Sequence, residues 1–155
     1  NVVISCGIND LKQSQIKSKQ DVDALYQAYR VKIKQIRSIN RRAHILVVPV
    51  LPTGSHEFNK RAIDFNRMLL EDVRESGLGV GAEHVSGLDN LLDSNGLLSG
   101  RFSKRFDKNG RRDVLHLNQT GTRYFARLIK FHNTVSFRIL YIISKNCCYI
   151  GLIYK

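Results

Sequence analysis

The sequence predicts an α/β protein in which a parallel sheet carries helices on both faces. Two short runs, residues 1–6 and 44–50, are almost continuously apolar, as expected of strands that are covered on both faces. Residues 21–37 instead carry apolar side chains at spacings of three and four, which is the period of one helix face. Strand-like and helix-like segments alternate along the chain, and this order is typical of parallel sheets.

The ends of these elements are predicted by turn and capping residues. The first long helix should end near Asn40, a residue that tolerates the left-handed conformation. Pro49 and Pro52 lack the backbone donor that a strand needs, so they should close the second strand. Ser55 is a candidate N-cap for a second helix that ends at residues 76–77. The buried face of this helix should consist of Phe58, Ala62, Phe65, Leu69 and Val73.

The second half of the chain predicts one more strand and one more helix. A third strand is expected at residues 83–85, and a polar loop at residues 89–112. Either Asn118 or Thr120 can cap the final helix. The apolar face of that helix should carry Tyr124, Leu128 and Phe131.

Residues 132–155 form an apolar tail without a helix period. Arg138 and Lys145 divide the tail into pieces shorter than the about 20 residues that span a bilayer, so no membrane span is expected. A pair of edge strands is one alternative. The preferred interpretation is that residues 1–131 form the domain and that the tail lies outside it.

Composition limits the function classes. The 155 residues suffice for one domain, and 25 Lys and Arg against 13 Asp and Glu give a net charge of +12. This excess favours weak contact with nucleic acid rather than sequence-specific reading, because the basic residues are dispersed. The cysteines, of which two are adjacent, predict reduced thiols and by default an intracellular protein, whose compartment is otherwise unknown. No spacing indicates a metal site, and no cofactor is expected.

Asp113 and His116 are the first candidate site residues. Three positions apart, at the junction of a loop and a helix, they can face one pocket. A carboxylate there can hold one imidazole nitrogen, fix the tautomer and stabilise the imidazolium that forms when a proton is accepted. A surface aspartate and histidine that are close by chance would show the same spacing.

Gly7, Asn9 and Asp10 are the second set. They follow the first strand at its carboxyl end, where ligands bind in parallel sheets. Glycine lets the backbone turn sharply, and an asparagine amide can donate a hydrogen bond to a developing oxyanion. An ordinary turn at the end of a strand would use the same residue types.

Together, the early Gly-x-Asn-Asp and the late Asp-x-x-His resemble the SGNH hydrolase superfamily, also called GDSL-type esterases and lipases. The resemblance covers roughly residues 1–131 and includes the stretches DFNRMLL and LLDSNGLLSGRF. It implies a flavodoxin-like, three-layer α/β/α fold without cofactor or metal, and a serine esterase mechanism through an acyl-enzyme. It also implies that Asn9 is an oxyanion-hole donor that Gly7 allows to approach, and that His116 is the base oriented by Asp113. Asp10 is expected to brace its loop.

The nucleophile of that family is missing from this sequence. No Gly-Asp-Ser precedes Gly7, Ser5 lies inside the predicted strand, and Ser94 lies in the late loop. The first two strands of the family's sheet are expected to be absent, which would leave residues 1–6 as an exposed apolar edge. The chain is therefore interpreted as a remnant that is inactive in isolation. A small ester would be its substrate only if the missing N-terminal part completed the site. The alternative is a non-catalytic basic interaction module or a retrotransposon-derived domain that binds nucleic acid loosely.

Overall fold

The structure is a computed structural model that describes residues 2–5, 7–79, 82–106, 109–110, 113, 115–132, 138–143 and 149–154. In chain order its elements are β1 (Val2–Ser5), α1 (Ile8–Leu11), α2 (Lys19–Ile39), β2 (Ile45–Val48), α3 (His56–Arg74), β3 (Ala82–His84), the 3-10 helix η1 (Leu88–Leu91), α4 (Gln119–His132), β4 (Arg138–Ile143) and β5 (Tyr149–Tyr154). The three predicted strands and the three predicted long helices are all present, with bounds that differ by a few residues. The α/β class is therefore confirmed.

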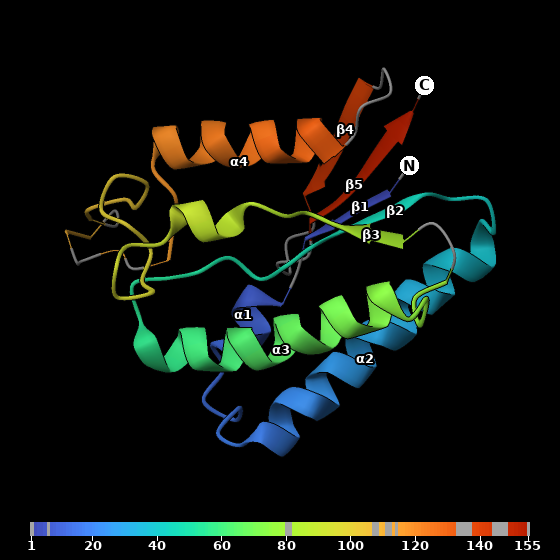
Figure 1. Cartoon of the computed structure of the whole chain (residues 1–155), viewed down its shortest axis with the longest axis horizontal. Helices are drawn as coiled ribbons and strands as arrows, with labels where there is room; N and C mark the ends of the chain where they lie inside the picture. Colours follow the sequence, from blue (N-terminus) through green and yellow to red (C-terminus); the bar gives the residue numbers. More distant parts are fainter. Residues whose placement is uncertain are drawn as a thin grey trace.

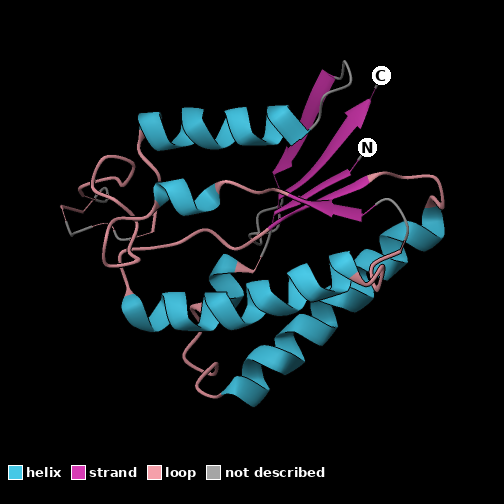
Figure 2. Cartoon of the chain, viewed as in Figure 1, coloured by secondary structure: helices cyan, strands magenta, loops and turns pink. Residues whose placement is uncertain are grey.

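The sheet has the order β3-β2-β1-β5-β4. Its first three strands are parallel, with Val2 of β1 opposite Ile45 of β2, and Ile45 opposite Ala82 of β3. Helices α2 and α3 cover one face of these strands, whereas η1 and α4 lie on the other (Figure 1). Figure 2 shows the resulting arrangement of a strand layer between two helical layers. This is a partial α/β/α fold with a parallel core of three strands.

Strand β2 shows why the apolar runs are continuous. Ile45 and Val47 pack into the core on the side of α2 and α3, whereas Leu46 and Val48 pack into the core on the side of η1 and α4. All four side chains are fully or almost fully buried. Because successive strand side chains point to opposite faces, burial of both faces requires an unbroken apolar sequence.

The N-termini of the two long helices are fixed by serine caps. Ser18 accepts a hydrogen bond from the backbone N–H of Asp21, whose carboxylate accepts one from Ser18 in return, which forms a capping box. Ser55 accepts from the backbone N–H of Phe58, as predicted. The predicted inner face of α3 is confirmed, with four side chains buried and one partly buried: Phe58, Ala62, Phe65, Leu69 and Val73.

The predicted end of α2 near Asn40 is confirmed but is not left-handed, and α3 ends before its predicted end. Asn40 is extended, with φ of −137°, because its side-chain oxygen accepts the backbone N–H of Arg42 and forms the turn without a left-handed residue. Helix α3 ends earlier than predicted, and Ser76 rather than Gly77 takes the left-handed conformation, with φ of 58°. Space at Gly77 is limited, since an added Cβ would force the Asp72 carboxylate to shift.

The final helix agrees with its prediction except at its last apolar residue. Asn118 caps α4, while Tyr124 and Leu128 pack against the core under η1. Phe131, however, is 72% exposed. Ile129 packs against this core instead, so the buried stripe turns away from Phe131 before the helix ends.

Strands β4 and β5 form an antiparallel pair that joins the sheet at β1. Val2 of β1 lies opposite Leu152 of β5, so the predicted exposed edge at β1 is wrong. This pairing agrees with the edge-strand alternative for the tail, and the division into a domain of residues 1–131 and a separate tail stays a prediction. Of the helices in the described ranges, none is both long and apolar enough to cross a bilayer. The three cysteines lie outside the described residues, so the prediction of reduced thiols is untested.

Candidate active site

Gly7 makes the turn from β1 into α1. Its φ of 103° is in the left-handed region, and an added Cβ would lie 3.1 Å from Cγ2 of Val50. A side chain at this position would therefore meet both conformational strain and crowding. Leu11 at the end of α1 is fully buried and anchors this short helix, so Asn9 is held at the surface just beyond the end of β1.

Helix α1 carries two polar side chains, those of Asn9 and Asp10. Within the described part of the chain, neither Asn9 nor Asp10 makes a side-chain hydrogen bond or ion pair. The backbone carbonyl of Asp10 accepts the N–H of Gln13 at 3.1 Å and closes the following turn. Among the described residues, therefore, none competes for the Asn9 amide, and the bracing role expected of the Asp10 carboxylate stays a prediction.

Asp113 and His116 are brought together as predicted. Nδ1 of His116 lies 2.8 Å from Oδ2 and 3.1 Å from Oδ1 of Asp113. The Asp113 side chain is 4% exposed, whereas that of His116 is 74% exposed. The carboxylate therefore fixes one edge of an imidazole whose other edge is open to solvent.

The electrostatics of the pair favour one tautomer. Burial raises the pKa of Asp113, but hydrogen bonds from the backbone N–H groups of His116 and Leu115, together with the His116 side chain, outweigh it and lower the pKa. The carboxyl is therefore an anion at neutral pH and acts as an acceptor, which places the proton of a neutral imidazole on Nδ1. The lone pair on Nε2 is then left to accept a proton, and no described residue hydrogen-bonds to that nitrogen.

Asn118 and Gly121 hold this segment against the preceding loop. The Asn118 amide donates to the carbonyl oxygens of Arg101 and Ser103 at 2.8 and 3.1 Å, and its oxygen accepts the N–H of Gly121 at 2.9 Å. A Cβ on Gly121 would lie 2.6 Å from the carbonyl oxygen of Phe102, so only glycine lets the helix approach so closely. Asn118 and Gly121 therefore have a packing role that fixes the segment containing His116.

Two asparagines on one face of α3 hold the loop that follows β2. Asn66 accepts the N–H of Val50 at 2.7 Å and donates to its carbonyl at 3.0 Å. Asn59, two turns earlier, accepts from the N–H and hydroxyl of Thr53 and donates to the carbonyls of Thr53 and Gly96. This second amide joins the loop after β2 to the long loop that leads toward His116.

The two halves of the predicted site lie beyond the same end of the sheet. Helix α1 follows the carboxyl end of β1, and the segment that leads into α4 lies beyond the carboxyl ends of the parallel strands, on the left of Figure 1. No hydrogen bond among the described residues joins Asn9 to His116. The structure therefore places Asp113 in contact with His116. That Asn9 faces the same substrate as His116 stays a prediction.

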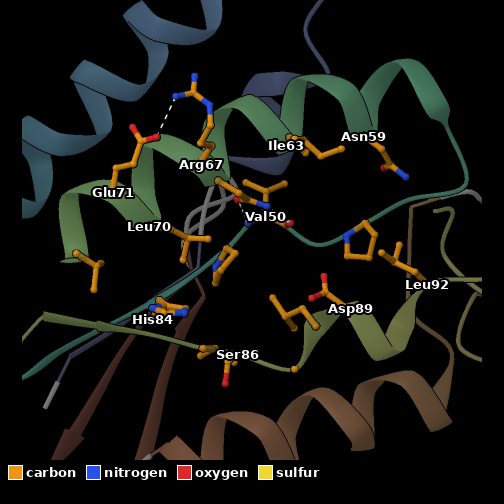
Figure 3. Close-up of a pocket in the computed structure, with 18 of the residues that line it drawn as sticks. Val50, Asn59, Ile63, Arg67, Leu70, Glu71, His84, Ser86, Asp89 and Leu92 are labelled. Atoms are coloured by element: carbon orange, nitrogen blue, oxygen red, sulfur yellow. Dashed lines mark hydrogen bonds and ion pairs between the residues drawn. The ribbon is translucent and has the colours of Figure 1, made fainter. Parts of the chain in front are cut away.

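Two cavities lie away from these residues. The larger, of about 970 Å³, is an open groove between α3 and the segment from β3 to η1 (Figure 3). Ile63 and Leu70 line it from α3, and His84 and Ser86 from the opposite side. The smaller, of about 520 Å³, is lined by three arginines that sequence analysis noted only as dispersed basic residues. Neither cavity is lined by Gly7, Asn9, Asp113 or His116.

A second serine–histidine contact lies at the end of β3. Nε2 of His132 is 3.1 Å from the backbone nitrogen of Ser86 and 3.2 Å from its hydroxyl oxygen. Because the backbone N–H can only donate, it occupies the lone pair that a general base would need. This contact joins the loop after β3 to the last turn of α4 and gives His132 a packing role.

No family model matches the chain, and no curated protein matches it. Among solved structures it is similar to a chain from Streptococcus pneumonia described as a "putative platelet activating factor", with a TM-score of 0.63 and 19% sequence identity. The match covers 81% of this chain and 56% of the streptococcal chain, so this chain spans a little over half the length of that protein. The likeness establishes the fold class, a partial α/β/α fold.

Proposed function

We propose that this chain is a partial serine ester hydrolase domain of the SGNH, or GDSL, type. The observation that carries the proposal is the buried Asp113 carboxylate on Nδ1 of an exposed His116, with Nε2 left open. The Gly7 turn, which presents the exposed Asn9 side chain beyond β1, supports it. The hydrolase-like fold is consistent with this assignment.

In the proposed reaction a serine hydroxyl attacks the carbonyl carbon of a small ester while His116 accepts the hydroxyl proton at Nε2. Asp113 stabilises the imidazolium that results. The Asn9 amide donates to the oxyanion of the tetrahedral intermediate, and the intermediate collapses to an acyl-enzyme as the alcohol leaves with the proton from His116. Water then attacks the acyl group by the same route and regenerates the serine. Acetylated sugars, lipids and other small esters all fit this chemistry.

The nucleophile of this reaction is not provided by the residues that surround His116. In the described part of the chain no serine hydroxyl hydrogen-bonds to its imidazole, and the sequence has no Gly-Asp-Ser before Gly7. Without one member, a Ser-His-Asp unit retains only a background rate that is lower by several powers of ten. We therefore expect the 155-residue chain alone to be inactive, and a serine would have to be supplied by residues outside it.

Esterase assays of two proteins test the proposal. The 155-residue chain should hydrolyse p-nitrophenyl acetate no faster than its His116→Ala variant, and a robust rate that this substitution abolishes would refute the predicted inactivity. The second protein is the chain extended by the segment encoded upstream. If that segment carries Gly-Asp-Ser, activity should appear and fall by about 10³-fold or more in His116→Ala. The exposed His56 provides the matched control, since His56→Ala should retain full activity.

The non-catalytic alternative makes the opposite prediction for the extended protein. A basic interaction module would show no His116-dependent hydrolysis in either protein. Ester hydrolysis by the extended protein that survives both His116→Ala and Asn9→Ala would likewise remove the basis for the proposed site.

A further inference from the structure

Three arginine residues give the lining of the smaller cavity a positive charge. Arg123 and Arg127 lie one turn apart on α4, and Arg101 reaches the same cavity from the loop before it. All three residues are exposed. Segments that are more than 20 residues apart in the sequence thus place three guanidinium groups around one cavity of about 520 Å³, a volume within the usual range of ligand pockets.

These arginines have no acidic partner in the part of the chain that the structure describes, since none of its ion pairs includes them. Helix α4 contains no acidic residue. Like charges four residues apart on a helix, such as Arg123 and Arg127, destabilise it. The arrangement is therefore unfavourable for the free protein and becomes favourable when an anion binds.

The walls of the cavity are held in place by aromatic and amide contacts. The Arg101 guanidinium lies 5.3 Å from the ring centre of Phe102, whose ring centre is 5.5 Å from that of Tyr124. The Asn90 amide donates to the Tyr124 hydroxyl at 3.0 Å, and that hydroxyl donates to the carbonyl of Gly87. A ligand would meet a largely preformed site, which reduces the entropy lost on binding.

We infer that this cavity binds the phosphodiester backbone of single-stranded nucleic acid. Guanidinium groups match phosphate oxygens in a bidentate geometry, and their planes also stack on bases beside aromatic rings. An anionic membrane would be a poorer partner, because none of the large apolar side chains exposed in the described part of the chain lines this cavity and could enter lipid. The inference is independent of the proposed esterase activity, since no residue of that site lines the cavity.

Binding of a fluorescent single-stranded DNA of about 20 nucleotides, followed by anisotropy at several salt concentrations, tests the inference. The whole chain should bind the DNA, and the affinity of the variant R101Q/R123Q/R127Q should be lower by at least about tenfold. The slope of log affinity against log salt should fall in magnitude by about 2, since about 0.7 counterion is released per phosphate contact. The variant R101K/R123K/R127K should keep the salt slope and lose part of the affinity, because lysine retains the charge but lacks the planar guanidinium that donates two parallel hydrogen bonds to a phosphate.

The matched control is R41Q/R42Q/R74Q, which removes the same charge from exposed arginines outside the cavity. It should change the affinity by less than about threefold. Equal losses in the two glutamine variants would overturn the inference in favour of diffuse attraction by the net charge. Absence of DNA binding, or binding to phosphatidylserine vesicles alone that the cavity variant abolishes, would overturn it too. Circular dichroism of each variant verifies that the fold is retained.

Discussion

Replacement of Asn59 by alanine should destabilise the protein far more than its position on a helix surface suggests. Asn59 is 7% exposed and Thr53 is fully buried. The Asn59 side chain accepts the Thr53 N–H at 2.8 Å and its hydroxyl at 2.9 Å, and it donates to the carbonyls of Thr53 and Gly96 at 2.9 and 3.1 Å. These four hydrogen bonds hold the loop after β2 and the loop toward His116 to one point on α3.

The cost can be worked out bond by bond. The Thr53 carbonyl keeps the N–H of Leu98 as a donor, and the Gly96 carbonyl lies at an exposed residue where water can replace the amide. The Thr53 N–H has no such substitute, and an unpaired buried donor costs about 1–3 kcal/mol. The other lost hydrogen bonds add about 1 kcal/mol, so Asn59→Ala should lower the free energy of unfolding by about 3 kcal/mol.

Urea unfolding followed by far-ultraviolet circular dichroism measures this loss. For a slope near 2 kcal/mol per molar urea, a loss of about 3 kcal/mol lowers the midpoint by about 1.5 M. The control is Asn95→Ala in the same loop. The Asn95 side chain is exposed and makes no hydrogen bond to a described residue, so the change should stay within about 0.5 kcal/mol. Equal midpoints for the two variants would refute the view that Asn59 joins the two loops.

Two other substitutions probe the segment around His116. Gly121→Ala should lower the free energy of unfolding by about 1–3 kcal/mol despite alanine's higher helix propensity, because its Cβ would lie 2.6 Å from the Phe102 carbonyl oxygen. The control Gly100→Ala, whose Cβ would meet open space, should leave the free energy of unfolding nearly unchanged in the same urea assay. Asp113→Asn should show a pH-dependent cost. The lowered pKa of Asp113 means that its ionised form stabilises the fold fully above the ordinary aspartate pKa of about 3.9, and that this stabilisation is lost as pH falls through the lower folded-state value. The difference in unfolding free energy between wild type and Asp113→Asn should thus shrink below about pH 4, and a difference that is independent of pH would contradict this account.

The features that could be predicted from sequence are those encoded locally. Continuous apolar character marks β2 because both of its faces are buried. The Asp113–His116 contact could be predicted because a carboxylate and an imidazole three positions apart in a turn lie within reach of each other. The cap at Ser55 could be predicted for the same reason, since the bond runs to a residue only three positions away.

The features that escaped prediction depend on contacts between distant segments or on competition between turn conformations. Arg101 meets Arg123 and Arg127 only because Gly121 allows α4 to pack closely on the preceding loop. Asn40 uses its side chain rather than a left-handed backbone to make its turn, and residue type alone does not decide between the two. The pairing of β5 with β1 likewise depends on strands that are distant in sequence.

The position of the proton on the neutral imidazole of His116 tests the central claim most directly. Two-bond hydrogen–nitrogen correlation spectra of the ¹⁵N-labelled chain at about pH 8, above the ordinary histidine pKa, distinguish the two tautomers. We predict that wild-type His116 carries its proton on Nδ1 and that Asp113→Asn shifts the population toward Nε2. A wild-type imidazole protonated on Nε2 would contradict the account, because that nitrogen would then have no lone pair to accept a proton from a serine.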